Sequence, residues 1–501
     1  MKKKKPLPSG SEWDFNTLTQ YEREIGRVAH DFGLDIYPNQ IEIITTEQMI
    51  DNYATIGMPR GYYHWSFGKQ HIEIEKNYSQ GLTGLAYEMV INANPCISYL
   101  LEENTLVMQA TVIAHACYGH NAFFKGNYLF HTWTSPESII DYLIFSRRFI
   151  AECEEKYGLE EVETLLDACH ALMNYGVDRY KRPQALSLQK EKARQKIRET
   201  YLQAQVNELW RTIPVKKKLK DGEKKAIFLP FPQEQEENIL YFLEKNAPLL
   251  EPWQREIIRI VRKIARYFYP QRLTKMMNEG WATFWHYTLI NALYDEGLLT
   301  DSFMLEFIDN HTHILQQRDF DDPYYAGINP YALGYHLFSD IKRYSEQPTE
   351  EDKIWFPLLA GQPWRQNIDC AMRNFKDDSF ILQYLSPHLI RKLKLFAIQD
   401  SPGNPDLLIS AIHDENGYKA LREILSNQYN LSLIEPNIQI VTVDIRGDRT
   451  LTLKHIQQDG KPLSRQTGAV LSHLRRLWGF KVVLESVTTG GTHIETHTAD
   501  E

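Results

Sequence analysis

The chain has 501 residues, of which 43% are hydrophobic, 12% aromatic and 24% charged, so it can bury large cores and is not a disordered chain. Its formal net charge of -9 argues against nucleic acid as a partner. No uninterrupted apolar run reaches about 18 residues, so we expect no integral membrane association.

The chain start and the cysteines predict a cytoplasmic protein. The basic segment 1–5 leads into Pro6-Leu7-Pro8 and has no apolar core, unlike a secretory signal. The five cysteines are odd in number and form no C-x-x-C pair, so we expect no disulfide framework.

Residues 11–399 predict a large, mainly helical domain. Its first part, 11–58, has the pattern of a helix, a strand at Gln40–Thr45 and a second helix. The mostly alternating stretch within Tyr62–Glu75 predicts a small β-hairpin region. From residue 84 to 124, apolar residues recur at intervals of three and four, which predicts buried helices.

A polar insertion interrupts this domain at about 183–227. It is rich in Lys, Arg, Gln and Glu, which is typical of a solvated helix and an exposed loop and less so of a basic docking site. Helical periodicity resumes at Glu237 and is strong over 255–268 and 273–296.

The last hundred residues change character, and residues 400–490 predict a separate α+β domain. Short strand-like and helix-like runs alternate in the order β-α-β-β-α-β, which predicts a ferredoxin-like fold. The runs are Asp406–Ile412, Tyr418–Asn427, Ile438–Ile445, Thr450–Ile456, Ala469–Trp478 and Lys481–Val487.

Two clusters place ionisable groups among apolar neighbours, where burial is costly without a partner. One contains His115 and His120, and the other contains Glu279 and His286. On a regular helix Glu279 and His286 share one face, about 20° apart, whereas His115 and His120 are about 140° apart. We expect Gly119 to end the helix and to swing His120 back toward His115.

Imidazole nitrogens and a carboxylate oxygen from two helices are suitable ligands for a divalent metal such as Zn²⁺. His115, His120, Glu279 and His286 are therefore the candidate metal ligands, and a hydrogen-bonded polar core is the alternative. Ala116 stands where the H-E-x-x-H motif of zinc peptidases has its general base, which weakens that assignment.

Other polar residues are candidates for supporting roles. Glu88 is a candidate catalytic base or further ligand, and His64 and His170 are candidates for further ligands or their partners. Asp178 and Arg179 predict a buried ion pair or a substrate clamp. Phosphate-binding motifs are absent from the sequence, so nothing supports nucleotide binding and no cofactor-binding residue is predicted, and a nucleophile elbow is absent too.

Several strings taken in order resemble the SpoVR (stage V sporulation protein R) family, and within it the YcgB-like branch. The strings are His64–Lys69, Tyr87–Asn92, Asn94–Ile97, His115–Asn121, Phe123–Asn127, Gly176–Tyr180, Asn278–Thr283, Gly327–Tyr331, Pro436–Gln439 and Arg446–Arg449. The resemblance spans nearly the whole chain.

The resemblance implies a role in making the spore cortex in spore formers, and in stationary-phase or stress physiology elsewhere. It also implies two partners, a serine protein kinase with an AAA+ module and a protein with a von Willebrand-type domain. It implies no catalytic residue. Two classes of function follow, a regulatory or scaffold protein and a metal-dependent hydrolase at the His/Glu cluster, and the missing general base at Ala116 favours the first.

Overall fold

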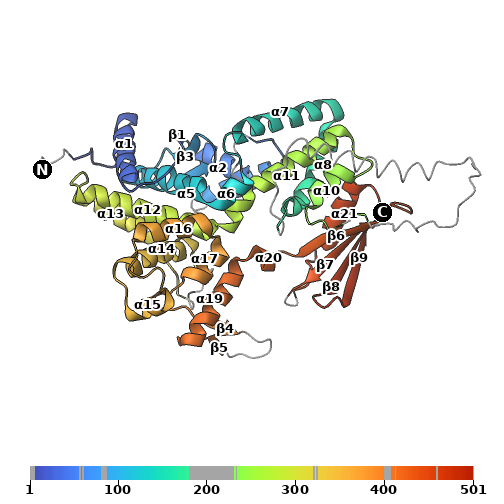
Figure 1. Ribbon diagram of the computed structural model, residues 1–501. Helices are drawn as coiled ribbons and strands as arrows, with labels where there is room; N and C mark the ends of the chain where they lie inside the picture. Colours follow the sequence, from blue (N-terminus) through green and yellow to red (C-terminus); the bar gives the residue numbers. More distant parts are fainter. Residues whose placement is uncertain are drawn as a thin grey trace, which may run out of the picture.

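The computed structural model describes residues 6–55, 58, 61–79, 87–179, 231–232, 234–319, 322, 325, 327–399, 408–411, 413–458 and 461–499. The predicted insertion at 183–227 lies outside these residues. A mainly helical body and a C-terminal α+β unit lie side by side, as predicted (Figure 1). No helix of the described residues is long and apolar enough to cross a membrane.

The N-terminal part surrounds a small mixed sheet of order β1-β3-β2. Its elements are α1 (Phe15–Asp31), β1 (Asn39–Ile44), α2 (Thr46–Ala54), α3 (Trp65–Ser79), β2 (Glu88–Ile91) and β3 (Cys96–Leu101). β1 is parallel to β3 and β2 is antiparallel to it. β2 therefore lies at an edge of this sheet, with Glu88 as its first residue.

Two predictions for this region are wrong. The expected hairpin within Tyr62–Glu75 is the helix α3, and Ile72 on it is exposed, so the alternation does not mark a buried strand face. Strands β2 and β3 occupy part of the stretch 84–124 that predicts helices. All six residues of β3 are buried, and a short apolar run fits either a strand or a buried helix.

The body continues with α4 (Leu106–Val112), the π-helix η1 (Ile113–His120), α5 (Asn121–Gly126), α6 (Tyr128–Trp133), α7 (Ile139–Tyr157), α8 (Leu159–Ala171) and the 3₁₀ turn η2 (Met173–Tyr175). Its second half contains α10 (Ile239–Asn246), α11 (Pro252–Leu273), α12 (Lys275–Asp295), α13 (Asp301–Ile314), α14 (Pro330–Glu346), α15 (Glu350–Trp355), α16 (Trp364–Asn374), α17 (Asp377–Tyr384) and α18 (Pro387–Lys392).

Helix α12 is the central element of the body. Its side chains are apolar on nearly all sides, and Trp281 and Trp285 are completely buried. A helix that is hydrophobic all round belongs in the interior of a large protein. α12 packs against α14 and η1, so the polar residues Glu279 and His286 on it are held inside the molecule.

The C-terminal part contains β4 (Ala397–Gln399), β5 (Leu408–Ala411), α19 (Glu415–Tyr429), α20 (Leu431–Ile434), β6 (Asn437–Val443), β7 (Leu451–Gln457), α21 (Thr467–Trp478), β8 (Val482–Thr488) and β9 (His493–Ala499). The main sheet has the order β6-β7-β8-β9. β7 and β8 are parallel and joined by α21, whereas the outer pairs are antiparallel.

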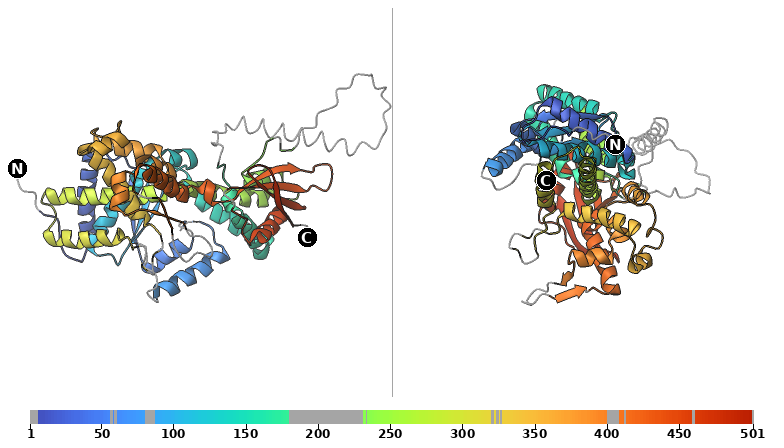
Figure 2. Two further views of the ribbon diagram at one scale, coloured as in Figure 1. Left: turned by 90° about the horizontal axis from the view of Figure 1, so that it is seen from below. Right: turned by 90° about the vertical axis from the view of Figure 1, so that its left-hand side faces the viewer.

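The sheet differs from the ferredoxin-like arrangement, because the first predicted strand is not part of it and the predicted third and fourth strands, β7 and β8, pair directly with each other. The first predicted strand exists as β5, but it pairs with β4 in a separate sheet, and the following helix α19 packs on α17 of the body. The unpredicted strand β9 fills the fourth position of the main sheet instead. Figure 2 shows this sheet at one end of the molecule, away from α14 and α16.

Candidate functional site

A π-helical turn brings His115 and His120 onto one face. Both residues belong to η1, which runs without a break from α4 into α5. A π-helix joins residues five apart by its backbone hydrogen bonds, so residues at that spacing lie one above the other. The two imidazole rings are 4.6 Å apart between centroids. The expected helix end at Gly119 is therefore wrong. The wider π-helical turn, and not a helix end, brings His120 next to His115.

Gly119 has a different role, which is to let α12 approach. A Cβ atom at this position would lie 2.6 Å from Ala282 Cα on α12, closer than a real side chain tolerates. Gly280 makes a similar backbone contact with Gly334 of α14. Because α12 lies so close to η1, Glu279 reaches both histidines.

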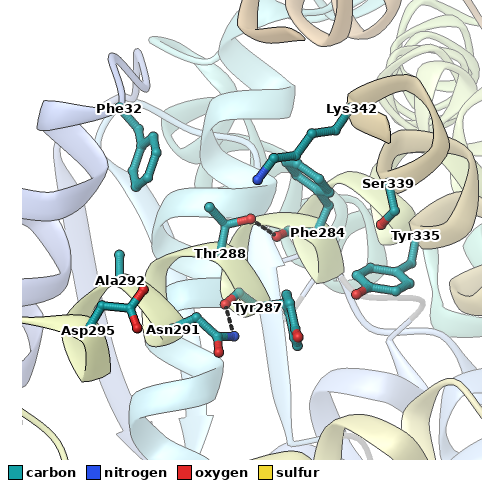
Figure 3. Close-up of a pocket in the computed structure, with 10 residues that line it drawn as sticks. All are labelled: Phe32, Phe284, Tyr287, Thr288, Asn291, Ala292, Asp295, Tyr335, Ser339 and Lys342. Atoms are coloured by element: carbon teal, nitrogen blue, oxygen red, sulfur yellow. Dashed lines mark hydrogen bonds between the residues drawn. The ribbon is translucent and has the colours of Figure 1, made fainter. Parts of the chain in front are cut away.

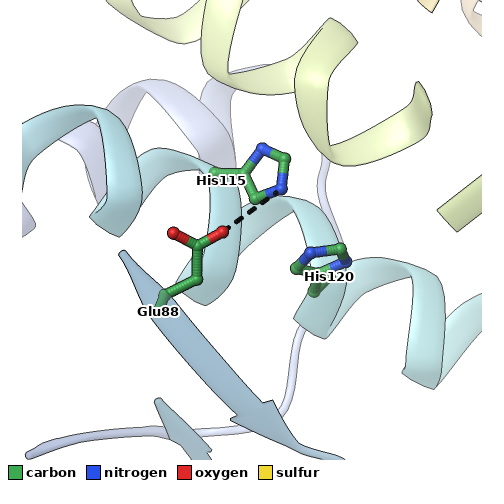
Figure 4. A group of neighbouring side chains, drawn as sticks. All are labelled: Glu88, His115 and His120. Atoms are coloured by element: carbon green, nitrogen blue, oxygen red, sulfur yellow. Dashed lines mark ion pairs between the residues drawn. The ribbon is translucent and has the colours of Figure 1, made fainter. Parts of the chain in front are cut away.

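Four side chains converge between β2, η1 and α12. Glu279 Oε2 lies 3.6 Å from His115 Nε2 and 3.5 Å from His120 Nε2. Glu88 Oε1 lies 3.6 Å from His115 Nε2 on the side of the sheet (Figure 4). One ligand atom from each of Glu88, His115 and His120 also lies within 4.8 Å of the other two. The structure thus assembles Glu88 and three of the four predicted ligands.

The electrostatics of this cluster favour a cation. Burial alone raises the pKa of Glu279, but His120 and His115 outweigh it and lower that pKa overall. Burial raises the pKa of Glu88. Burial lowers the pKa of His115, yet Glu279 and Glu88 raise it above its ordinary value. Two half-buried carboxylates beside the same imidazole thus favour a positive charge between them, which a proton or a metal ion supplies.

His120 has the protonation and orientation of a metal ligand. Burial lowers its pKa to about 4, so the ring is neutral at neutral pH. Its Nδ1 lies 2.9 Å from Asn278 Oδ1. An amide oxygen can only accept, so Nδ1 carries the proton and the lone pair of Nε2 faces Glu279. Asn278 therefore orients His120, a role that residue spacing alone does not reveal.

His286 lies in the cluster but cannot be a ligand in this arrangement. Its Nδ1 lies 3.0 Å from His115 Nδ1, and its Nε2 lies 2.8 Å from His311 Nδ1. Both ring nitrogens are therefore engaged by other histidines. Glu279 and His286 do lie on one face of α12, as predicted. His286 contacts Nδ1 of His115, whereas Glu279 contacts Nε2 of the same ring.

The donor atoms have the separations of a metal site. Ligands about 2.0–2.2 Å from a tetrahedral zinc ion are about 3.3–3.6 Å from one another. The Glu279 oxygen is at such distances from both Nε2 atoms. By hydrogen-bond geometry His115 Nε2 and Glu279 Oε2 are also buried without a partner among the described residues, although the Tyr331 hydroxyl is near enough to the Glu279 carboxylate to help lower its pKa. Such buried, unsatisfied polar atoms are rare and call for an ion or a water.

The remaining candidates lie elsewhere. His64 forms ion pairs with Glu163 and Asp167 at 3.0 and 3.3 Å, and His170 Nε2 lies 2.6 Å from the Tyr62 hydroxyl. These two histidines face each other, with ring centroids 4.5 Å apart, in a second polar cluster at α3 and α8.

The candidates at 178 and 179 have separate partners. Arg179 forms an ion pair with Glu435 at 2.6 Å, and Asp178 accepts a hydrogen bond from Asn238 at 3.4 Å. The ion pair of Arg179 joins the segment after η2 to the segment before β6. The predicted ion pair between Asp178 and Arg179 is therefore wrong, because Glu435 takes the place of Asp178 as the partner of Arg179.

Fold and site together define a mainly helical protein with a buried His–Glu centre and an α+β C-terminal unit. The family model described as SpoVR like protein matches residues 12–434, and the model described as SpoVR-like C-terminal domain matches residues 436–489. The chain belongs to the SpoVR family. The boundary between the two matches falls just before β6, so α19 is part of the first match.

The chain is 60% identical over 486 residues to the uncharacterized protein YcgB of Escherichia coli strain K12. This similarity covers 97% of the chain and 95% of that relative. No solved structure matches the chain.

Proposed function

We propose that this chain is a metal-dependent hydrolase whose metal is held by His115, His120 and Glu279, with Glu88 as the general base. The observation that carries the proposal is the convergence of one carboxylate oxygen on two imidazole Nε2 atoms, at 3.6 and 3.5 Å. Two histidines and a glutamate form a ligand set of catalytic zinc sites, which keep a fourth position for water.

The two glutamates are assigned by their positions. Glu279 lies near both Nε2 atoms, whereas the ion pair of Glu88 is with His115 alone. The pKa of Glu279 is lowered, which suits an anionic ligand, and burial raises the pKa of Glu88, which suits a proton acceptor. A base on strand β2 also answers the objection that Ala116 occupies the position of the base in zinc peptidases.

A metal ion held by His115, His120 and Glu279 would lower the pKa of a bound water toward neutrality. Glu88 would take a proton from a water placed there, and the water oxygen would attack an electrophilic carbon or phosphorus of the substrate. The bond to the leaving group would break, and Glu88 would return the proton to that group.

Metal analysis tests the site. Protein purified without chelator should contain about one metal ion per chain. Replacing Glu279 by Gln keeps the shape but removes the charge, and should lower the content below about 0.1 ion per chain. The exposed Glu103 provides the control, since E103Q should leave the content unchanged. A wild-type content below about 0.1 would overturn the proposal.

Turnover tests the chemistry. We expect chelator-sensitive hydrolysis of at least one substrate in a panel of chromogenic esters, peptides and phosphoesters. E88Q should keep the metal and lower kcat by about 10²–10⁴, the usual contribution of a general base. Hydrolysis that persists unchanged in E88Q would remove Glu88 from the mechanism.

The regulatory role, the kinase and von Willebrand-type partners, and the place in spore cortex formation or stress physiology remain predictions of the family resemblance. They concern what the chain binds and when it acts. The proposed hydrolase concerns what the buried centre can do, so both can hold for one protein. Co-purification with tagged partner proteins tests the former independently.

A further inference from the structure

Three buried histidines form a continuous chain that leads away from the proposed metal site. His115 of η1, His286 of α12 and His311 of α13 are at most 6% exposed. The ring nitrogens are linked by two contacts, Nδ1 to Nδ1 at 3.0 Å and Nε2 to Nδ1 at 2.8 Å. We call these residues the histidine chain.

The histidine chain has a direction. A neutral imidazole has one N–H donor and one acceptor nitrogen. His286 is completely buried between two other imidazoles, and each of its ring nitrogens faces one of them. Each ring in the middle of such a chain must therefore accept at one nitrogen and donate at the other. Only two arrangements satisfy both contacts, and they run in opposite directions.

The direction of the hydrogen bonds in the histidine chain decides whether Nε2 of His115, which faces Glu279, carries a lone pair or a proton. If His115 Nδ1–H donates to His286 Nδ1, then His286 Nε2–H donates to His311 Nδ1, and His115 Nε2 carries a free lone pair. If the direction is reversed, His115 Nδ1 accepts and its Nε2 carries the proton. Only the first arrangement leaves a metal ligand at His115, because a metal binds the nitrogen without a proton.

The far end of the chain lies beside a cavity. His311 is packed between Tyr287 and Tyr335, with ring centroids 4.8 and 5.1 Å away. Both tyrosines line a cavity of about 360 Å³ that Phe32, Phe284 and Lys342 also border (Figure 3). The far end of the histidine chain thus packs against two residues of the cavity wall.

We propose that His286 and His311 are positioning residues, which hold His115 in the tautomer whose Nε2 faces the metal, and that metal binding fixes the direction of the whole histidine chain. This inference rests on the proposed metal site and deepens it. A hydrogen-bonded partner on the second nitrogen of a ligand histidine typically changes metal affinity by 10–100-fold.

The test compares two substitutions at His286 by zinc affinity, measured by competition with a chromogenic chelator. The amide of H286Q can accept from His115 and donate to His311, whereas H286L can do neither. We expect H286L to bind Zn²⁺ about 10–100-fold more weakly and H286Q to stay within a few fold of wild type. The control is H313Q, because His313 is exposed and bonds within its own helix to Asp309.

A merely structural role would lower the thermal stability of the metal-free variants without this difference in affinity. Equal zinc affinity of H286L, H286Q and wild type would overturn the inference and leave the metal site intact. Absence of zinc binding in the wild type would overturn the metal site and the inference with it.

A measurement on the wild type covers the case in which H286L does not fold. The ¹⁵N shifts of histidine-labelled protein report which ring nitrogen carries the proton, and H311Q assigns the signal of His311. With Zn²⁺ bound, His311 should be protonated at Nε2 and not at Nδ1. The opposite tautomer in the zinc-bound protein would overturn the inference.

Discussion

Asn278 is the residue that decides how His120 is presented. Its side-chain oxygen lies 2.9 Å from His120 Nδ1 and both residues are buried. Replacing Asn278 by Ala removes the acceptor, so His120 is free to rotate or to change tautomer. We expect metal affinity to fall by about 10–100-fold.

Equilibrium dialysis with Zn²⁺ measures this change. The control is N291A on the same helix, because the Asn291 side chain donates to the backbone carbonyl of Tyr287 one turn earlier and, among the described residues, does not contact the histidines. A loss of affinity in N291A equal to that in N278A would show that any asparagine lost from α12 disturbs the site, and would contradict an orienting role for Asn278.

Sequence identifies the donors of the site but not their partners. His115, His120 and Glu279 stand out because ionisable groups are rare in apolar helices. Asn278 is 158 residues from its partner His120, and His311 is 25 residues from its partner His286. No local sequence pattern therefore marks either Asn278 or His311. His286 fits a ligand by spacing alone, and only the position of His311 shows that its second nitrogen is occupied.

At the scale of the elements, the close contact between η1 and α12 creates the site. A Cβ at Gly119 would lie 2.6 Å from Ala282 Cα, and backbone cannot move as a flexible side chain can. We expect G119A to destabilise the protein by about 1–3 kcal/mol and to weaken metal binding, because the two helices must separate.

Urea denaturation and zinc titration of G119A measure both effects. G68A is the matched control, because a Cβ at Gly68 on helix α3 meets nothing within 4 Å. This change should be neutral or stabilising, by up to about 1 kcal/mol. A G119A variant with wild-type stability and affinity would contradict the proposed contact.

The join between α14 and α15 depends on one buried carboxylate. Asp352 accepts two hydrogen bonds of 2.7 Å from Arg343 and one of 2.9 Å from the Thr349 backbone. Burial alone raises the pKa of Asp352, but these hydrogen bonds outweigh it and lower the pKa from 3.8 to about 2. The resulting stability is full above about pH 4 and is lost as pH falls toward 2.

Replacing Asp352 by Asn should therefore cost at least about 2 kcal/mol at pH 7, and the difference from wild type should shrink below about pH 4. Denaturation at pH 7, 4 and 3 follows this change. E350Q is the control, because Glu350 is 86% exposed and its ion pair contributes little. A difference between D352N and wild type that is independent of pH would contradict the assignment.

Element types follow from sequence where periodicity is long and fail where it is short. The segment 273–296 predicts α12 within two residues at its start and one at its end, because three turns or more of apolar residues exclude a strand. The sequence does not distinguish the π-helical turn of η1 from an α-helix, because its residues are as apolar as those of a buried α-helix. Strand β3 lies in a stretch that predicts helices, because a short apolar run fits either type, and helix α3 lies in one that predicts a hairpin, because its residues partly alternate.

At the scale of the whole molecule, the C-terminal sheet shares a core with the body. Leu453 of β7, Val482 of β8 and Leu477 of α21 belong to one apolar cluster with Leu166 of α8 and Ile257 of α11. The predicted boundary near residue 400 is a change of pattern along the sequence. The packing shows that the two parts share a buried apolar interface.

We therefore expect the chain to unfold as one cooperative unit. Leu477 is 1% exposed, and replacing it by Ala leaves a cavity that costs about 2–5 kcal/mol. L477A should lower the Tm of the entire protein, because the shared core transmits the loss to the body.

Saturating Zn²⁺ should raise the Tm of wild type and L477A by similar amounts, since the metal acts on the folded state at a separate site. Differential scanning calorimetry with and without Zn²⁺ gives both numbers. Two separate transitions, of which L477A shifts one and Zn²⁺ the other, would show that the C-terminal unit folds independently.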